Sequence, residues 1–397
     1  MSIFQPYIYL YSIILLAFLL CIVKEELSYT GGNTSVLLEK VKHIRSFKKV
    51  DFFCFFTVSI IVLLFIATRD VTVGTDTATY VAFFKHPSFL YHEEKTDLFF
   101  EYYGRVLRLL IGKSKEGFIF FSSLISCFGV FFIIWKTSKR KMYSLLLFMI
   151  MGTSSIFFFQ YLCLMRQCIA ISYFMLAIYF LFEYKSSAYR KYFLFLIFYI
   201  SAVFTHASCL FTLPFIIIAY FKPITKKEIW LAVILVTYFM SALGISIVGD
   251  LIELVFGFLD FGKYSGYAKI NFGMIEQKGW LNMNLLPFIV LASIILYVCP
   301  FKKIGDFRIQ FALFSVVLNN LFYDNLMWSR LTLYLSLFMI ITIPNVTFDK
   351  LKICKFSTIA FILVYYLYKT STQLIFNASW LATGNFIVPY KSWLFEF

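Results

Sequence analysis

Apolar runs separated by short polar stretches recur along almost the whole chain. Each run holds about 15 to 20 residues, enough for a helix to cross roughly 30 Å of hydrocarbon. The pattern predicts about twelve membrane spans. They fall near residues 7–23, 50–67, 116–135, 142–159, 165–183, 192–206, 207–221, 228–248, 284–299, 308–323, 331–346 and 356–374. We therefore expect an all-α polytopic membrane protein in which residues 1–397 form a single transmembrane domain.

Lysine and arginine fall in alternate connections between these runs. The basic connections are 40–49, 136–141, 185–191, 222–227, 302–308 and 350–355. Basic residues in short loops mark the cytoplasmic side of a membrane, so both termini are predicted to lie outside. Three segments then face outward, at about 68–115, 249–283 and 375–397.

The first outer segment contains the stretch FFEYYGRVLRLLIG, residues 99–112. Its apolar residues recur at helical spacing, opposite Glu101, Arg105 and Arg108. These apolar residues are Phe99, Tyr102, Tyr103, Val106 and Leu110. The spacing predicts an amphipathic helix that lies in the membrane interface.

The composition supports the membrane class and excludes two others. Hydrophobic residues make up 61% of the chain and charged residues 14%, which is far more apolar than a soluble domain. The net charge of +15 does not indicate nucleic-acid binding, because the basic residues punctuate apolar runs instead of forming one basic motif. The eight cysteines lack zinc or disulfide spacing, so no metal or cofactor is expected. The opening MSIFQPYIYLYSIILL predicts a first span, since it lacks the features of a removed signal.

Two arginines stand near the predicted outer ends of spans. Arg166 lies in a long apolar stretch, about 28 Å of helix from Lys185, where a charge needs a partner, water or a ligand. Its alternatives are snorkelling to outer headgroups or pairing with an acid. Arg330 lies about 30 Å of helix from Lys350, and Asp324 is close enough in sequence to pair with it.

A histidine and an acidic loop complete the outward polar groups. His206 falls where the stretch between Lys191 and Lys222 must turn back, and a helix cap is its simpler role. The segment TRDVTVGTDTATY begins the first outer loop. Asp76 there either makes an Asx turn or presents its carboxylate, and Arg69 and Asp70 could form an ion pair.

These residues together suit a polyanionic lipid headgroup. Arginine binds phosphate oxygens through two hydrogen bonds and keeps its charge at low dielectric, so it suits a polyprenyl diphosphate. Sugar transfer also needs a carboxylate or imidazole to deprotonate the acceptor hydroxyl. Both kinds of group are present on this side.

At these positions the sequence resembles the EpsG family, which are Wzy-type polymerases of O-antigen and capsule repeat units. The matching pieces are Arg69 followed by GTDTATY, FEYY at 100–103, MRQCIAISYF around Arg166 and FTHASCLFTLP around His206. Weaker matches are WSRLTLY at Arg330 and VPY near the end. The chain departs from the family at Thr77, where an aromatic residue is frequent.

The resemblance implies a glycosyltransferase in the bacterial cytoplasmic (inner) membrane. It would join oligosaccharide units linked to polyprenyl diphosphate, such as undecaprenyl diphosphate, on the periplasmic face. One lipid-linked unit is donor and another acceptor. The product would be lipopolysaccharide O-antigen, capsule or exopolysaccharide, and a chain-length regulator protein would be a further partner.

The resemblance also suggests roles for individual residues. Arg69, Arg166 and Arg330 would hold the diphosphate. The first outer loop is similar to that of GT-C membrane glycosyltransferases, whose loop acid is the catalytic base. By that analogy Asp76 is the first candidate base, His206 the second and Glu101 the third. Three tyrosines are expected to stack on sugar rings, namely Tyr80, Tyr102 and Tyr173.

Two other function classes remain open. A flippase or exporter of lipid-linked oligosaccharide should carry charges at mid-depth and often shows repeat symmetry. A ligase or acyltransferase could use the same lipid, and an acyltransferase places its catalytic histidine in the membrane, which His206 allows. The charges at one face favour the polymerase.

Overall fold

The structure is a computed structural model that describes most of the 397 residues. The described ranges are 3–30, 37–86, 98–152, 155–243, 285–300, 303–322, 330–347, 352–378 and 387–395. Within these ranges the chain forms helices and isolated β-bridges, such as the antiparallel bridge between Arg69 and Ser392, and no strand. The all-α prediction is therefore confirmed for this part of the chain.

The chain divides into two compact units. The first comprises Met1–Met151, Ile156–His206 and Ile362–Phe397, and the second comprises Gly152–Ser155 and Ala207–Phe361. Whether both act as one transmembrane domain stays a prediction.

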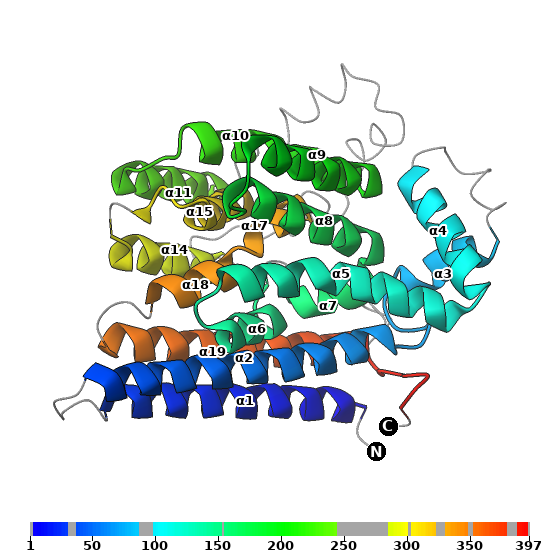
Figure 1. The fold of residues 1–397 in the computed structure, drawn as a ribbon, viewed down its shortest axis with the longest axis horizontal. Coiled ribbons are helices and arrows are strands. Elements are labelled where there is room, and N and C mark those ends of the chain that lie inside the picture. The colour runs from blue at the N-terminus through cyan, green and yellow to red at the C-terminus, as the bar shows by residue number, and fades with distance from the viewer. Residues whose placement is uncertain are drawn as a thin grey trace. The chain divides into compact units, whose positions relative to one another are not determined.

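The first unit contains long helices and three short ones (Figure 1). They are α1 (Gln5–Thr30), α2 (Leu37–Ala67), α3 (Thr77–Lys85), α4 (Leu98–Ile111), α5 (Lys115–Thr137), α6 (Lys141–Ile150), α7 (Phe157–Cys163), α8 (Met165–Phe182), α9 (Ala188–Thr205) and the part of α19 (Lys352–Ala378) from Ile362.

The second unit is built around a buried helix, α15. Its elements are η2 (Ala207–Thr212), α10 (Leu213–Phe221), α11 (Lys227–Ala242), α14 (Leu286–Val298), α15 (Phe307–Leu321), η4 (Arg330–Thr332), α17 (Leu333–Ser336) and α18 (Met339–Thr347). Buried amides of α15 hold its neighbours. Gln310 Nε2 donates to Ile224 O at 2.8 Å, and Asn320 Nδ2 donates to Thr237 Oγ1 at 3.0 Å.

Six helical segments of the described chain are long and apolar enough to cross a membrane. They are Gln5–Glu26, Phe47–Ala67, Lys115–Thr137, Met165–Phe182, Ala188–Thr205 and Ser357–Phe376, and each coincides with a predicted run. The other predicted runs contain shorter apolar helices, such as α11, α14 and α15. The structure thus shows a helical membrane protein, and the expected number of about twelve spans stays a prediction.

The predicted continuous span at 142–159 is wrong. Helix α6 ends at Ile150 and α7 begins at Phe157, because the polar stretch GTSS at 152–155 interrupts the apolar run. A second break at Leu164 separates α7 from α8. Broken helices at membrane depth need partners for their backbone groups. Here Phe157 N donates to Met151 O at 2.9 Å and Ile156 N donates to Gln373 Oε1 at 3.2 Å.

Helices α5 and α8 approach closely at one glycine. A Cβ on Gly129 would lie 2.5 Å from Ser172 Cα, and Gly129 N donates to Ser172 Oγ at 2.8 Å. Small residues at such crossings allow the backbones of membrane helices to pack tightly. This contact fixes α8 against α5.

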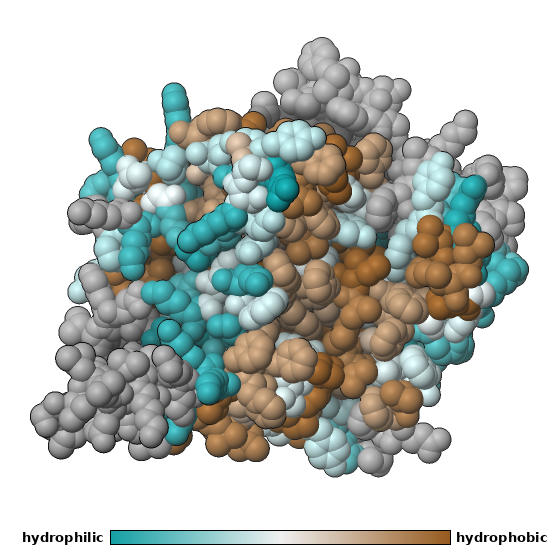
Figure 2. Space-filling model, in the orientation of Figure 1, coloured by the Kyte–Doolittle hydropathy of each residue, from teal (hydrophilic) through white to brown (hydrophobic). Residues whose placement is uncertain are grey.

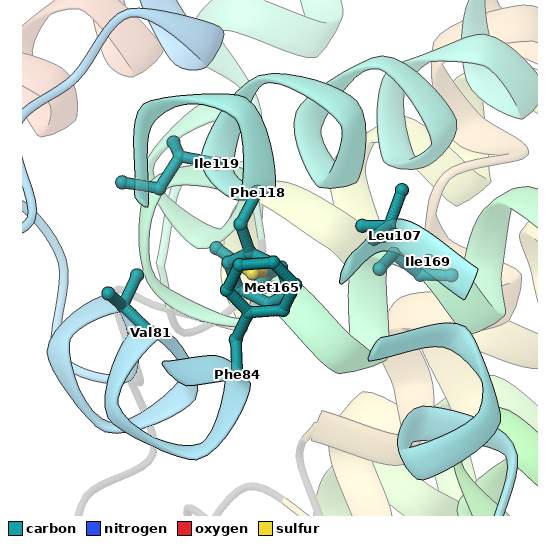
Figure 3. Packing of buried hydrophobic residues seen from close by; sticks show 7 residues of the cluster. All are labelled: Val81, Phe84, Leu107, Phe118, Ile119, Met165 and Ile169. Carbon is teal, nitrogen blue, oxygen red and sulfur yellow. The ribbon is translucent and has the colours of Figure 1, made fainter. Parts of the chain in front are cut away.

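The short helices of the first outer loop pack on α5 and α8 through one hydrophobic cluster. Figure 3 shows Phe84 of α3 and Phe118 of α5 face to face, with Met165 of α8 beside them. The two rings stack with centroids 4.5 Å apart. Leu107 of α4 and Ile169 of α8 complete this side of the cluster. The cluster therefore sets the start of α8 against the outer loop.

The predicted amphipathic helix is confirmed as α4, but its inward face differs from the prediction. Leu107 is buried, and Arg108 Nη1 donates to Phe84 O at the end of α3, at 2.8 Å. Arg108 turns inward because the last carbonyls of a helix attract cations. Val106, Leu109 and Leu110 are exposed and form a hydrophobic patch over α4 (Figure 2).

The two ends of the first unit's helices differ in polarity. In Figure 2, hydrophilic residues gather where α5 meets α6, and hydrophobic residues run along α5 toward α3 and α4. We call the α5–α6 end the basic end; it carries Lys136 and the run Lys139–Lys141. We call the opposite end, with the starts of α1, α5 and α8 and the ends of α2 and α9, the outer end, after the side on which the sequence predicts it; the orientation itself stays a prediction.

Candidate functional site

The loop between α2 and α3 is shaped by one glycine. Gly74 has φ +92°, and a Cβ there would lie 2.0 Å from Leu162 O, so only glycine fits. Thr77 Oγ1 donates to Val73 O at 2.8 Å and closes the turn. The loop therefore packs directly on α7, and Asp76 comes to the junction of α7 and α8.

Asp76 occupies the position before α3, but its carboxylate does not cap that helix. The Asx turn in this loop is made instead by Asp70. Its Oδ1 accepts from Thr72 N at 3.0 Å and from Thr72 Oγ1 at 2.8 Å. The Asx-turn alternative for Asp76 is wrong, and its half-buried carboxylate is directed to other groups.

Arg69 is buried at the outer end of α2, with an exposed fraction of 1%. Its Nη1 donates to Ile66 O at 2.6 Å and to Ser123 Oγ at 3.0 Å. Nε has no hydrogen-bond partner among the described residues. No described carboxylate lies within ion-pair distance of Arg69. The alternative of an Arg69–Asp70 ion pair is therefore wrong.

The thiol of Cys163, at the end of α7, is affected by the charges of both Arg69 and Asp76. Burial raises its pKa to about 11, and the charge of Asp76 adds to that rise. Hydrogen bonds from Thr75 and the charge of Arg69 act in the opposite direction. Arg69 and Asp76 thus lie within electrostatic range of the same atom.

Arg166 follows this junction in the first turn of α8. It is half-buried between two buried neighbours, Met165 and Gln167. No side chain caps the start of α8, so the partial positive charge of the helix N-terminus adds to the guanidinium charge. An arginine at this position opposes the usual charge preference of a helix.

His206 reaches the same end of the unit as Arg166. Helices α8 and α9 form an antiparallel hairpin joined by residues 183–187, so the start of α8 and the end of α9 lie together. His206 is the residue after α9, where its backbone N donates to Ala202 O at 2.9 Å. Helix α9 thus ends at the predicted position, and the imidazole is half-buried. That the chain turns back at His206 stays a prediction.

The aromatic candidates divide into two groups. Tyr80 and Tyr173 pack partly buried against the cluster of Figure 3. Tyr102 is 61% exposed on α4 beside the Arg105 guanidinium, whose carbon lies 5.7 Å from the ring centroid. Arg105 also forms an ion pair with Glu101, at 2.5 Å. Glu101 is thus the candidate base that forms an exposed ion pair with an arginine of its own helix.

Arg330 belongs to the second unit. The turn that carries it is fixed by Thr332, whose Oγ1 donates to Asn319 Oδ1 at 2.9 Å. Asp324, its predicted partner, lies outside the described residues. That Arg330 meets Arg69 and Arg166 stays a prediction.

The structure adds groups that the sequence pattern did not indicate. Ser123 binds Arg69 although nothing in its local sequence distinguishes it. Lys369 is 8% exposed inside the apolar segment Ser357–Phe376, and a lysine in an apolar run was a signal available in the sequence. The predicted outer segment at 249–283 lies outside the described residues.

The C-terminal segment 387–395 closes the outer end. Asp70 N donates to Lys391 O at 2.8 Å, and Trp393 N donates to Thr68 O at 3.0 Å. Tyr7 OH of α1 donates to Ile387 O at 2.6 Å. The segment, red in Figure 1, thus lies with the start of α1 and the end of α2, as expected if both termini share one side.

The EpsG family matches residues 53–392, which include every candidate residue named above. The chain belongs to the EpsG family. No curated protein and no solved structure matches it. The resemblance inferred from the short motifs is therefore confirmed over most of the chain. This EpsG protein is a membrane protein of a polysaccharide polymerase-like family, and two arginines, a carboxylate and a histidine lie toward the outer end of its first unit.

Proposed function

We propose that this EpsG protein polymerises oligosaccharide repeat units carried on polyprenyl diphosphate at the outer face of a bacterial cytoplasmic membrane. The family supplies the polymerase class. The observation that carries the proposal is the buried charge of Arg69, which has no carboxylate partner in the described chain and lies near Asp76. A buried cation without a protein counterion is costly unless an anion binds there.

The transfer would use the outer-end groups in distinct roles. An acceptor hydroxyl attacks the anomeric carbon of the donor sugar, and the bond between that carbon and the diphosphate oxygen breaks. Asp76 takes the hydroxyl proton as general base. The diphosphate leaves with the electron pair, and Arg166 with Arg69 stabilises its charge. Arg330 is the proposed third cation, and Tyr80, Tyr102 and Tyr173 are proposed to contact sugars.

His206 and Glu101 remain the alternative bases. His206 lies at the same end as Arg166 and is half-buried, so its imidazole suits a proton acceptor or a hydrogen-bond donor to the sugar. Glu101 is the weaker candidate because its carboxylate is held in an ion pair with Arg105 on α4.

The orientation follows from charge and from α4. The basic end should face the cytoplasm, which places Asp76, Arg69 and the C-terminal segment outside. The exposed apolar face of α4 suits the outer membrane interface. The proposed glycan is O-antigen, capsule or exopolysaccharide, with a chain-length regulator as partner.

A flippase is the second candidate, and Lys369 is the observation that favours it. This lysine lies about 10 Å of helix inside the end of its apolar segment at Phe376. Lys369 is therefore an exception to the expectation that the charged residues gather at one face. A charge inside the membrane is what passage of a headgroup would require.

Deletion of the gene followed by gel analysis of surface glycan separates the two. A polymerase predicts loss of the long-chain ladder with a single repeat unit retained. Complementation should restore the ladder with the wild-type chain. Loss of every surface repeat unit would favour the flippase or a ligase instead.

A further inference from the structure

A hydrophobic groove of about 480 Å³ runs between α2 and α5 in the first unit. It extends from Phe52 to Leu63 on α2 and from Trp135 to Leu124 on α5. Eleven residues of helix make the groove about 16 Å long, roughly half the hydrocarbon thickness of a bilayer. Its volume is that of a site for a small molecule.

The groove has a buried floor and an exposed aromatic rim. Phe55 and Cys127 on the floor are 3% and 1% exposed. On the rim Phe56 is 55% exposed and Phe128 is 53% exposed. Both helices are candidate membrane spans, so the rim faces the lipid phase and admits an apolar chain from the side.

One end of the groove lies one residue along α5 from a contact of the buried arginine. Leu124, at that end, directly follows Ser123, whose Oγ accepts from Arg69 Nη1 at 3.0 Å. Arg69 carries a buried charge whose Nε has no partner among the described residues. An apolar channel that ends at a fixed cation is complementary to an amphiphile with an anionic head and an apolar tail.

We propose that this groove binds the isoprenoid chain of the lipid-diphosphate substrate, with the diphosphate at the Arg69 end. The inference rests on the proposed function, which supplies a lipid diphosphate. Transfer of the chain from bilayer to groove gains little from the hydrophobic effect, because both surroundings are apolar. The groove gains dispersion contacts with its aromatic walls instead, and these contacts position the diphosphate beside Asp76 and Arg166.

Photocrosslinking in lipid nanodiscs tests the groove directly. The full chain is irradiated with a polyprenyl diphosphate that carries a diazirine in its chain, and labelled residues are mapped by mass spectrometry. Labelling should fall on Phe56, Phe128 and their groove neighbours. Excess unlabelled polyprenyl diphosphate should reduce it about tenfold, and excess phosphatidylglycerol should not. Labelling elsewhere, or equal competition by both lipids, would overturn the proposal.

A matched pair of variants supplies the second test. Ile60→Trp places a larger ring in the groove, whereas Phe53→Trp alters a 69% exposed residue of α2 outside it. The first should raise KM for lipid-linked donor about tenfold with kcat nearly unchanged, and the second should leave both unchanged. Equal kinetics in the two variants would overturn the groove. If Ile60→Trp fails to fold, labelling of the wild-type chain decides.

The groove and the proposed function can fail separately. Competed labelling in a protein that polymerises nothing would support the groove and contradict the polymerase. Normal polymerisation with labelling on other helices would contradict the groove and leave the polymerase standing.

Discussion

The two ends of the first unit treat buried charge in opposite ways. At the basic end, Glu25 Oε1 accepts from Arg140 Nε at 2.9 Å and from Arg140 Nη2 at 2.7 Å. Asp51 accepts from the backbone N atoms of Lys141 and Met142, at 2.9 and 3.0 Å, and so caps the start of α6. Buried charges at this end are balanced by partners within the protein.

At the outer end, by contrast, one buried arginine has no carboxylate partner among the described residues. Arg69 is buried with no described carboxylate within ion-pair distance, and its Nε has no hydrogen-bond partner among the described residues. A buried cation of this kind lowers stability relative to a paired one. Functional sites commonly retain such unfavourable groups for a ligand, so the comparison separates structural charges from substrate-binding ones.

The largest expected effect follows from removing the proposed base. Asp76→Asn keeps the shape of the side chain but cannot accept the proton, so the polymerisation rate should fall about 10²–10⁴-fold with lipid-linked substrate still bound. Rates from purified protein on a lipid-linked repeat unit measure this. His206→Gln should be milder, and Glu101→Gln milder still. Normal polymerisation by Asp76→Asn with an inactive His206→Gln would make the histidine the base.

Substitutions at the basic end should lower the stability of the protein and leave its kinetics unchanged. Glu25→Gln leaves Arg140 buried without its carboxylate, which costs about 3 kcal/mol. Thermal unfolding of the purified protein should therefore occur at a clearly lower temperature, whereas KM at a permissive temperature stays unchanged. If KM for lipid substrate rises while the unfolding temperature stays at the wild-type value, the basic end contacts substrate. The contrast between the two ends would then be wrong.

A geometric test sharpens the role of Arg166. Arg166→Lys keeps the charge but loses the planar two-point contact with phosphate oxygens, so activity should fall about tenfold or more. Arg105→Lys is the control, since its exposed ion pair with Glu101 lies on the surface of α4 and contributes little. Full activity of Arg166→Lys at normal protein level would support snorkelling to headgroups.

The smallest expected effect concerns the loop before α3. Burial alone would raise the pKa of Asp70, but hydrogen bonds from Thr72 and the charge of Lys115 outweigh it, so the pKa is lowered. The stabilisation is then present above the ordinary value of about 3.9 and lost as pH falls through the lower folded-state pKa. Asp70→Asn should melt slightly earlier than wild type at pH 7, and the gap should close on acidification. If the difference in unfolding temperature widened on acidification, the predicted lowering of the Asp70 pKa would be wrong.

Much of this arrangement follows from the sequence, and the reasons are local. Long apolar runs predicted the six segments that can span a membrane, and helical spacing predicted α4. The end of α9 at Thr205, just before His206, agrees with the length between Lys191 and Lys222. Each of these features depends on hydrophobicity and helix geometry, which a single stretch of sequence contains.

Other features depend on contacts between distant segments. Nothing near Leu164 marks the break between α7 and α8, since neither Gly nor Pro is there. Ser123 is distinguished only by Arg69, 54 positions away. The inward turn of Arg108 requires the carbonyl of Phe84. Periodicity cannot indicate such pairings, because they arise when elements pack.

The buried charge of Arg69 is proposed to bind the lipid diphosphate. The most direct measurement compares Arg69→Met with wild type for polyprenyl diphosphate affinity and for unfolding temperature. Arg69→Met should bind polyprenyl diphosphate about tenfold more weakly than wild type, or weaker still. Its unfolding temperature should be unchanged or higher, because a buried charge without a counterion is removed. If Arg69→Met keeps the wild-type affinity and unfolds at a lower temperature, Arg69 stabilises the fold and does not bind the diphosphate.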